Sequence, residues 1–131
     1  MIVLDTHTLL WWIGGGALSK QARAAIEAES GEEGEIVVSA ISAWEIALLV
    51  SRGKIRLSMD VSDWVGKVGQ IDAVRFIPVD TSIAIKSIGL PGQFHNDPAD
   101  RVIVATARAL SAPIVTRDRL IRKYEHVKTI W

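Results

Sequence analysis

Short apolar runs alternate with longer stretches of mixed polarity along the whole chain. Continuous apolar runs at 2–4, 36–38 and 114–116 are typical of strands buried on both faces of a sheet. Stretches with apolar residues along one side, flanked by capping or turn residues, predict helices. We expect these helices at 19–29, 42–53, 61–71, 81–88 and 98–110, with a helical turn or two at 119–124. Two further strands are expected at 74–79 and 127–130.

Strands and helices alternate from end to end, and this order predicts an α/β sandwich around a mostly parallel sheet. With 131 residues and no linker or repeat, residues 1–131 are expected to form a single domain. A hydrophobic content of 49% excludes a disordered chain. The absence of cysteine excludes a disulfide framework, a thiolate metal site and a cysteine nucleophile.

The first residues do not have the pattern of an export signal, because no basic segment precedes the apolar stretch and Asp5 interrupts it. No apolar run approaches the roughly 20 residues that span a bilayer. We therefore expect a cytoplasmic protein with no membrane partner.

Acidic residues stand where the predicted strands end and the predicted helices begin. Asp5 ends the first strand, and Asp118 follows the strand at 114–116. Glu45 and Asp100 are expected in the first turns of helices. Because ligands gather beyond the carboxyl ends of parallel strands, these carboxylates are expected to converge on one cleft.

Carboxylates in such a cluster either become protonated or recruit a cation. Oxygen ligands without cysteine favour Mg²⁺, Mn²⁺ or Ca²⁺. Mg²⁺ or Mn²⁺ held by few carboxylates keeps waters that can be activated for phosphodiester hydrolysis. The net charge is zero, but a basic rim is expected to hold phosphates, unless it is only a solvated helix face: Arg117, Arg119, Arg122 and Lys123.

Each acid also has a purely structural interpretation. Asp5 is suited to a turn and Asp118 to a helix N-cap. Glu45 is suited to a capping box with Ser42, and Asp100 to the first turn of a helix. Asp97 precedes Pro98 and is interpreted first as an N-cap and second as support for the metal site. A cap fully explains Asp80, which also follows a strand.

Four segments together resemble the PIN domain and, more narrowly, the VapC-type toxins of bacterial toxin–antitoxin pairs. They are MIVLDTHTLLWW, VSAISAWEIALLVSRGKI, FHNDPADRVIVATA and IVTRD, which follow one another in order between residues 1 and 118, so the resemblance extends over essentially the whole chain. The resemblance implies a PIN-like α/β/α sandwich that cuts RNA with Mg²⁺ or Mn²⁺. It implies that Asp5 and Asp100 are primary metal ligands, completed by Glu45 and Asp118.

The resemblance also assigns supporting positions and partners. Thr6 and Thr116 match positions where a hydroxyl orients an acid or a metal-bound water. An RNA substrate, a homodimer and a cognate antitoxin that covers the cleft are further implications. The apolar residues 9–13 cannot all face one side of a helix, so some of them either meet another chain or are core. For His7 and His95, a surface or structural role is favoured.

Two other functions compete with an endoribonuclease. One is a Mg²⁺-dependent phosphatase in which Asp5 is a covalent nucleophile, as in haloacid-dehalogenase phosphatases. Those enzymes need a second Asp two residues later, where this chain has His7. The other is a non-catalytic module that binds RNA or protein and keeps the acids for stability.

Overall fold

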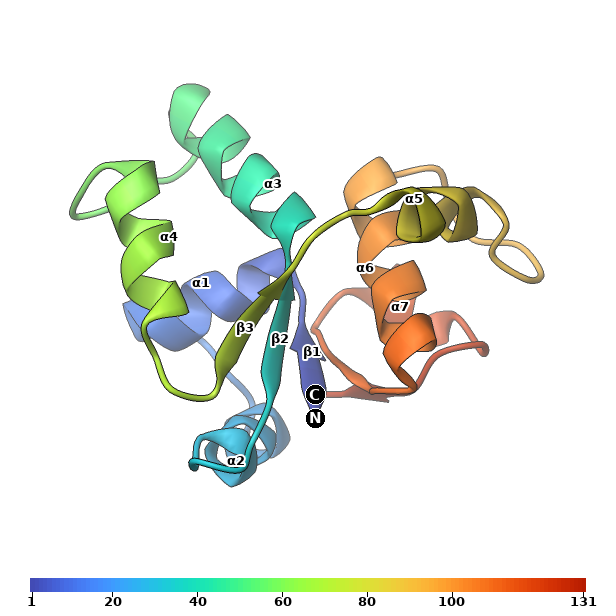
Figure 1. Ribbon diagram of the computed structural model, residues 1–131, viewed down its shortest axis with the longest axis horizontal. Helices are drawn as coiled ribbons and strands as arrows, with labels where there is room; N and C mark the ends of the chain where they lie inside the picture. Colours follow the sequence, from blue (N-terminus) through green and yellow to red (C-terminus); the bar gives the residue numbers. More distant parts are fainter.

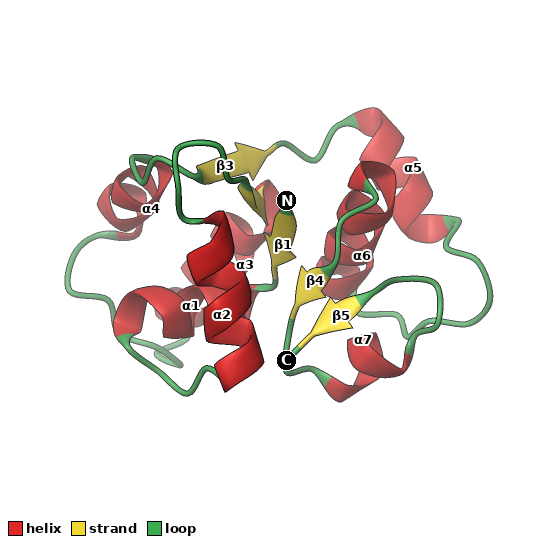
Figure 2. Cartoon of the chain, turned by 90° about the horizontal axis from the view of Figure 1, so that it is seen from below, coloured by secondary structure: helices red, strands yellow, loops and turns green.

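The centre of the protein is a five-stranded sheet in which every strand pairing is parallel. The computed structural model describes residues 1–131. The strands lie in the order β3-β2-β1-β4-β5. Their bounds are β1 (Ile2–Leu4), β2 (Ile36–Ser39), β3 (Val74–Ile77), β4 (Ile114–Val115) and β5 (Thr129–Ile130). Figure 1 shows β3, β2 and β1 side by side, and Figure 2 shows β4 and β5. The predicted parallel sheet is confirmed. The strands expected at 74–79 and 127–130 are shorter in the structure, at Val74–Ile77 and Thr129–Ile130.

Strand β1 is the middle strand, and its alternating side chains divide the core into two parts. Ile2 and Leu4 pack in a cluster with Leu9 and Ile26. Val3 points to the opposite face and packs with residues of the 98–110 helix. All three β1 residues are at most 4% exposed. Burial on both faces explains why this strand has no polar position.

Seven helices cover the sheet: α1 (Thr6–Gly14), α2 (Lys20–Glu29), α3 (Ala40–Ser51), α4 (Val61–Gly69), α5 (Thr81–Ile88), α6 (Pro98–Leu110) and α7 (Arg119–Lys123). Helices α1, α2 and α4 lie on one face, and α5, α6 and α7 lie on the other (Figure 2). No helix is long and apolar enough to cross a membrane.

Two local predictions differ from the structure. Helix α1 was not predicted, because its apolar residues follow one another without a one-sided period and only Leu9 among them is fully buried. The capping box at Ser42 is wrong. Helix α3 begins earlier, at Ala40, because the Ser39 side chain accepts a hydrogen bond from the backbone N–H of Ile41 and caps the helix.

The chain enters a helix directly after three neighbouring strands. Asp5 links β1 to α1, Ser39 links β2 to α3, and residues 116–118 link β4 to α7. Since β2, β1 and β4 are adjacent and parallel, these helix starts share one edge of the sheet. The candidate functional site lies at this edge.

Candidate metal centre

Asp5 is fixed by hydrogen bonds to both of its carboxylate oxygens. Its Oδ1 accepts from the backbone N–H of Thr8 at 2.8 Å and caps α1. Its Oδ2 accepts from the hydroxyl of Thr116, which lies beyond the neighbouring strand β4. Only 8% of Asp5 is exposed. The structural interpretation of Asp5 as a turn or cap residue is therefore also correct, and the cap itself holds the carboxylate at the sheet edge.

Asp118 is held in a similar way at the start of α7. Its Oδ1 accepts from the backbone N–H groups of Leu120 and Ile121, at 2.9 and 3.0 Å. The backbone N–H of Asp118 donates to the Thr116 hydroxyl oxygen at 3.0 Å. Thr116 is fully buried and so joins the two acids. It occupies the orienting position that the resemblance implied.

Asp97 and Asp100 stand together at the start of α6. Asp97 is the N-cap, and its Oδ1 accepts from the backbone N–H of Asp100 at 2.9 Å. Burial, followed by the negative charges of Asp97, Asp118, Glu45 and Asp5, raises the pKa of Asp100 to about 7. Burial and the surrounding carboxylates thus both oppose a negative charge at Asp100, and burial has the larger effect.

Glu45 reaches the same place from the second turn of α3 rather than from the first, because α3 begins before Ser42. Ser42 is fully buried, and its Oγ accepts a hydrogen bond from the Thr6 hydroxyl at 2.9 Å. Thr6 therefore links α1 to α3 and does not bond to an acid. Glu45 is half-buried.

All of these acids line one cleft of about 500 Å³ at the carboxyl edge of the sheet. Its walls are formed by Asp5, Thr6, His7, Trp11, Glu45, Asp97, Asp100, Arg117 and Asp118. None of the five acids forms an ion pair with a lysine or arginine. The wall contains one arginine, Arg117, and no lysine. The Arg117 guanidinium lies 5.9 Å from the Trp11 ring centroid. The cleft is thus an acidic pocket in which no lysine or arginine of the chain pairs with an acid.

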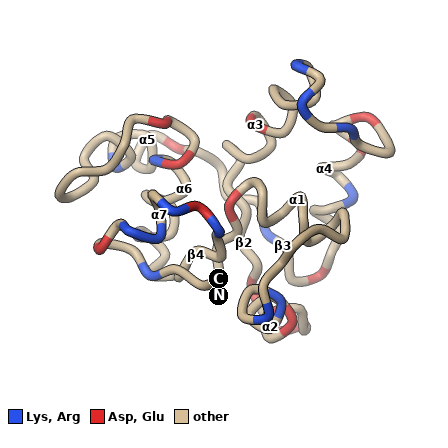
Figure 3. Tube along the Cα trace, turned by 180° about the vertical axis from the view of Figure 1, so that it is seen from behind, with Lys and Arg blue, Asp and Glu red and all other residues tan.

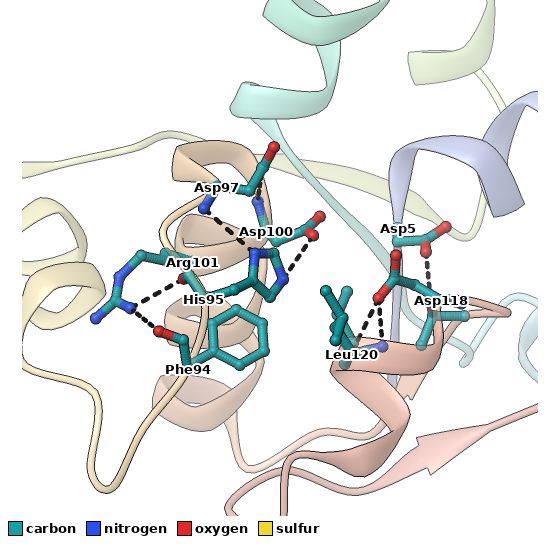
Figure 4. Close-up of polar contacts among 10 residues, drawn as sticks. Asp5, Phe94, His95, Asp97, Asp100, Arg101, Asp118 and Leu120 are labelled. Carbon is teal, nitrogen blue, oxygen red and sulfur yellow. Dashed lines mark hydrogen bonds and ion pairs between the residues drawn. The ribbon is translucent and has the colours of Figure 1, made fainter.

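His95, for which the sequence favoured a surface or structural role, lies beside the acids of this site. Its Nε2 lies 3.1 Å from Asp100 Oδ2, is shielded from solvent and has no hydrogen-bond partner. Its Nδ1 accepts from the backbone N–H of Asp97 at 3.3 Å. Figure 4 shows the ring beside Asp100, facing Asp118 across the cleft. The only signal in the sequence is its position two residues before the helix cap.

Arg101 holds the loop that carries His95. Its guanidinium donates to the carbonyl oxygens of Ser87, Ile88, Phe94 and His95, at distances between 2.7 and 3.1 Å. One charged group thereby ties the end of α5 to the loop before α6 (Figure 4). The bonds fix the backbone of His95, and with it the side chain that faces Asp100.

The donors at this site fit a hard divalent cation. A ring nitrogen of His95 and carboxylate oxygens of Asp100 and Asp118 lie within 4.8 Å of one another. Neighbouring ligands of an octahedral ion bound at about 2.1 Å are roughly 3 Å apart. The shielded Nε2 and the raised pKa of Asp100 are features that a cation at this place would satisfy.

Comparisons with known proteins place this geometry in a family. The family model described as PIN domain matches residues 2–127. Ribonuclease VapC22 of Mycobacterium tuberculosis is 35% identical over 133 residues, covering 99% of this chain and 98% of that protein.

Solved structures share the fold at low identity. VapBC2 from Rickettsia felis, bound to a DNA fragment from its promoter, has a TM-score of 0.70 at 16% identity, covering 98% of this chain and 97% of that chain. FitAcB from Neisseria gonorrhoeae has a TM-score of 0.67 at 21% identity, covering 98% of this chain and 96% of that chain. A toxin–antitoxin complex from Klebsiella pneumoniae has a TM-score of 0.65 at 18% identity, covering 97% of this chain and 95% of that chain. The chain belongs to the PIN domain family, as a homologue of the VapC ribonucleases.

Proposed function

We propose that this protein is an endoribonuclease that depends on Mg²⁺ or Mn²⁺ and is the toxin of a toxin–antitoxin pair. The observation that carries the proposal is the cleft of five acids without a lysine or arginine partner, in which the pKa of Asp100 rises to about 7. A cleft of this charge repels the phosphates of RNA unless a cation neutralises it. Membership of the PIN domain family supports the choice of RNA as substrate.

In this proposal Asp5 and Asp100 hold the ion, and Glu45 and Asp118 bind it through water or help to hold a second ion. An ion so bound lowers the pKa of a water and stabilises negative charge on phosphate oxygens. The chain's own part is to fix the acids: Thr116 and the helix caps hold Asp5 and Asp118 in place. Arg117, at the rim, is placed to bind a phosphate of the substrate.

The experiment measures cleavage of a structured RNA by the wild type and by Asp5→Asn, with Mg²⁺, with Mn²⁺ and with EDTA. We expect cleavage by the wild type with either ion, and none by Asp5→Asn or with EDTA. Asp80→Asn is the matched control, because Asp80 caps α5 as Asp5 caps α1 but lies outside the cleft. Equal cleavage by all three proteins in EDTA contradicts the proposal. RNA binding that is insensitive to EDTA, without cleavage, identifies a non-catalytic module instead.

The antitoxin is proposed to bind an apolar groove beside the cleft. This groove, of about 430 Å³, is lined in part by Leu10, Trp11, Ile13 and Trp64. His7 and Trp11 line both the groove and the cleft, so a chain lying in the groove can direct a basic side chain to the acids. An antitoxin segment in the groove would contact Leu10, Trp11 and Ile13, whereas Trp12 packs against the core. The structural neighbour from Klebsiella pneumoniae is a toxin–antitoxin complex, which supports this choice of partner.

A binding assay with the small protein encoded next to this chain tests the groove. Ile13→Asp is expected to abolish the complex and to leave RNA cleavage intact, because Ile13 is 37% exposed and outside the acidic cleft. Ile85→Asp is the control, since Ile85 is an exposed apolar residue of α5, far along the chain from the groove. Retention of the complex by Ile13→Asp argues against this groove.

A further inference from the structure

A second hollow lies next to the acidic cleft, on the other side of His95. It has a volume of about 320 Å³, at the lower end of the range of small-molecule sites, about 300 to 1,000 Å³. It lies between the loop before α6 and helix α7. His95 lines this hollow while its Nε2 contacts Asp100, which lines the cleft. The two cavities are therefore neighbours, separated by one imidazole ring.

Aromatic rings form one side of the hollow. The Phe94 ring centroid lies 4.3 Å from that of His95 and 4.9 Å from that of Tyr124. Tyr124 is 6% exposed, and its hydroxyl donates to the carbonyl oxygen of Pro91. Phe94 and His95 are only half-buried, so part of their surface is open. Because Tyr124 and the Arg101 bonds hold them, these rings form a preorganised wall.

The opposite side is formed by α7, whose exposed side chains are all basic except Leu120, which lines the hollow. Leu120 is 53% exposed, in a five-residue helix whose other exposed side chains are Arg119, Arg122 and Lys123. Figure 3 shows basic positions, in blue, along α7. Lys123 also lines the hollow, and Glu125 is the single acid of its rim. Such a surface suits a polyanion that carries a flat apolar group, because the group packs on the apolar residue and the negative charges pair with the surrounding cations.

We propose that this hollow, hereafter the base pocket, binds an unpaired nucleobase of the RNA strand whose phosphodiester lies in the acidic cleft. The proposal rests on the proposed nuclease function and adds the class of substrate. The base stacks against Phe94 and Leu120 while α7 binds the flanking phosphates. A base in duplex RNA cannot leave its stack without loss of pairing, so the pocket selects single-stranded segments or loops.

The test uses ¹H–¹⁵N NMR of the metal-free protein in EDTA, where no cleavage occurs. Each of the four nucleoside 5′-monophosphates is titrated into the millimolar range, and ribose 5-phosphate is the control without a base. We expect base-dependent shifts of amide signals in residues 92–95 and 120–126. In Leu120→Ala the affinity for the nucleotides falls about fivefold, for the loss of roughly 40 Å² of apolar contact. Ile88→Ala, which removes a more exposed apolar side chain from α5 (77% against 53% for Leu120), leaves the affinity unchanged.

The outcomes separate this proposal from the nuclease function. Equal shifts with ribose 5-phosphate and with nucleotides overturn it, because they identify a phosphate site only. Shifts confined to other parts of the chain, no shifts, or shifts unaffected by Leu120→Ala also overturn it, even when the wild type cleaves RNA. Base-dependent shifts that Leu120→Ala weakens support the pocket even when the cleavage assay with Asp5→Asn fails.

Discussion

The Thr116 hydroxyl donates to Asp5 Oδ2 across 111 residues of sequence, and its own oxygen accepts the backbone N–H of Asp118. One buried hydroxyl thus sets the position of two acids that follow adjacent strands. Thr116→Val keeps the side-chain shape and removes both bonds. We expect a loss of about 1–3 kcal/mol in the free energy of unfolding, because a buried N–H loses its partner. We also expect weaker binding of Mn²⁺.

Urea unfolding of the metal-free protein and a Mn²⁺ titration check this prediction. Thr116→Ser is the matched control, because it keeps the hydroxyl and removes one methyl group. Unchanged Mn²⁺ affinity in Thr116→Val means that Asp5 holds its position without the bond.

Asp100 predicts how stability depends on pH. Its pKa rises from the usual 3.8 to about 7 in the folded protein. The protonated form is therefore favoured by folding, and its stabilising contribution is complete below pH 3.8 and is lost as the pH rises towards and through 7. Asp100→Asn abolishes this loss of stability at high pH, because asparagine does not ionise. In EDTA at pH 8 we expect Asp100→Asn to be more stable than the wild type by about 1–2 kcal/mol, after allowance for solvent screening.

Thermal unfolding in EDTA at pH 4 and pH 8 measures this effect. The difference between the two proteins should shrink towards zero at pH 4, and saturating Mn²⁺ should reverse it at pH 8. A constant difference at both pH values contradicts the pKa assigned to Asp100.

The position of His95 beside Asp100 predicts that its removal weakens metal binding. Groups that orient a metal ligand typically change affinity by about 10- to 100-fold when removed. We expect His95→Ala to weaken Mn²⁺ binding by this amount and His95→Gln, which keeps a polar group near the Nε2 position, to recover part of it. Electron paramagnetic resonance of free Mn²⁺ gives the affinity. His126→Ala is the control, since His126 lies in the base pocket and does not line the acidic cleft. If His95→Ala, His95→Gln and His126→Ala bind Mn²⁺ with equal affinity, His95 is not part of the metal centre.

Arg101 predicts local rather than global instability. Lysine keeps the charge but cannot reproduce the planar set of donors that binds four carbonyl oxygens. In Arg101→Lys we expect faster amide hydrogen exchange in residues 89–97, with the sheet unaffected. Arg108→Lys is the matched control on the same helix, because Arg108 binds only the carbonyl of His126. Uniform acceleration over the whole chain contradicts a local clamp.

The convergence of the acids follows from the sequence because it depends on few rules. Asp5 and Asp118 follow buried apolar runs, and parallel strands bring their carboxyl ends to one edge. Glu45 was placed in the right helix but one turn too early. The Ser42 pattern matched a capping box, whereas Ser39, at the end of a buried strand, makes the cap. Local spacing does not distinguish these two serines; the extent of the strand does.

His95 and Arg101 were out of reach for a different reason. Their contacts depend on how the irregular loop at 89–97 folds back on α6, and no period or capping rule describes such a loop. The same holds for the base pocket, which requires α7 to face that loop. Sequence rules predicted the acids, which follow regular elements, and missed the groups around them.

The most direct test of the metal centre is anomalous diffraction from a crystal soaked in Mn²⁺. The account predicts a peak in the acidic cleft, within about 2.2 Å of carboxylate oxygens of both Asp5 and Asp100. A cleft without an anomalous peak at saturating Mn²⁺, or peaks only at acids elsewhere on the surface, would contradict it.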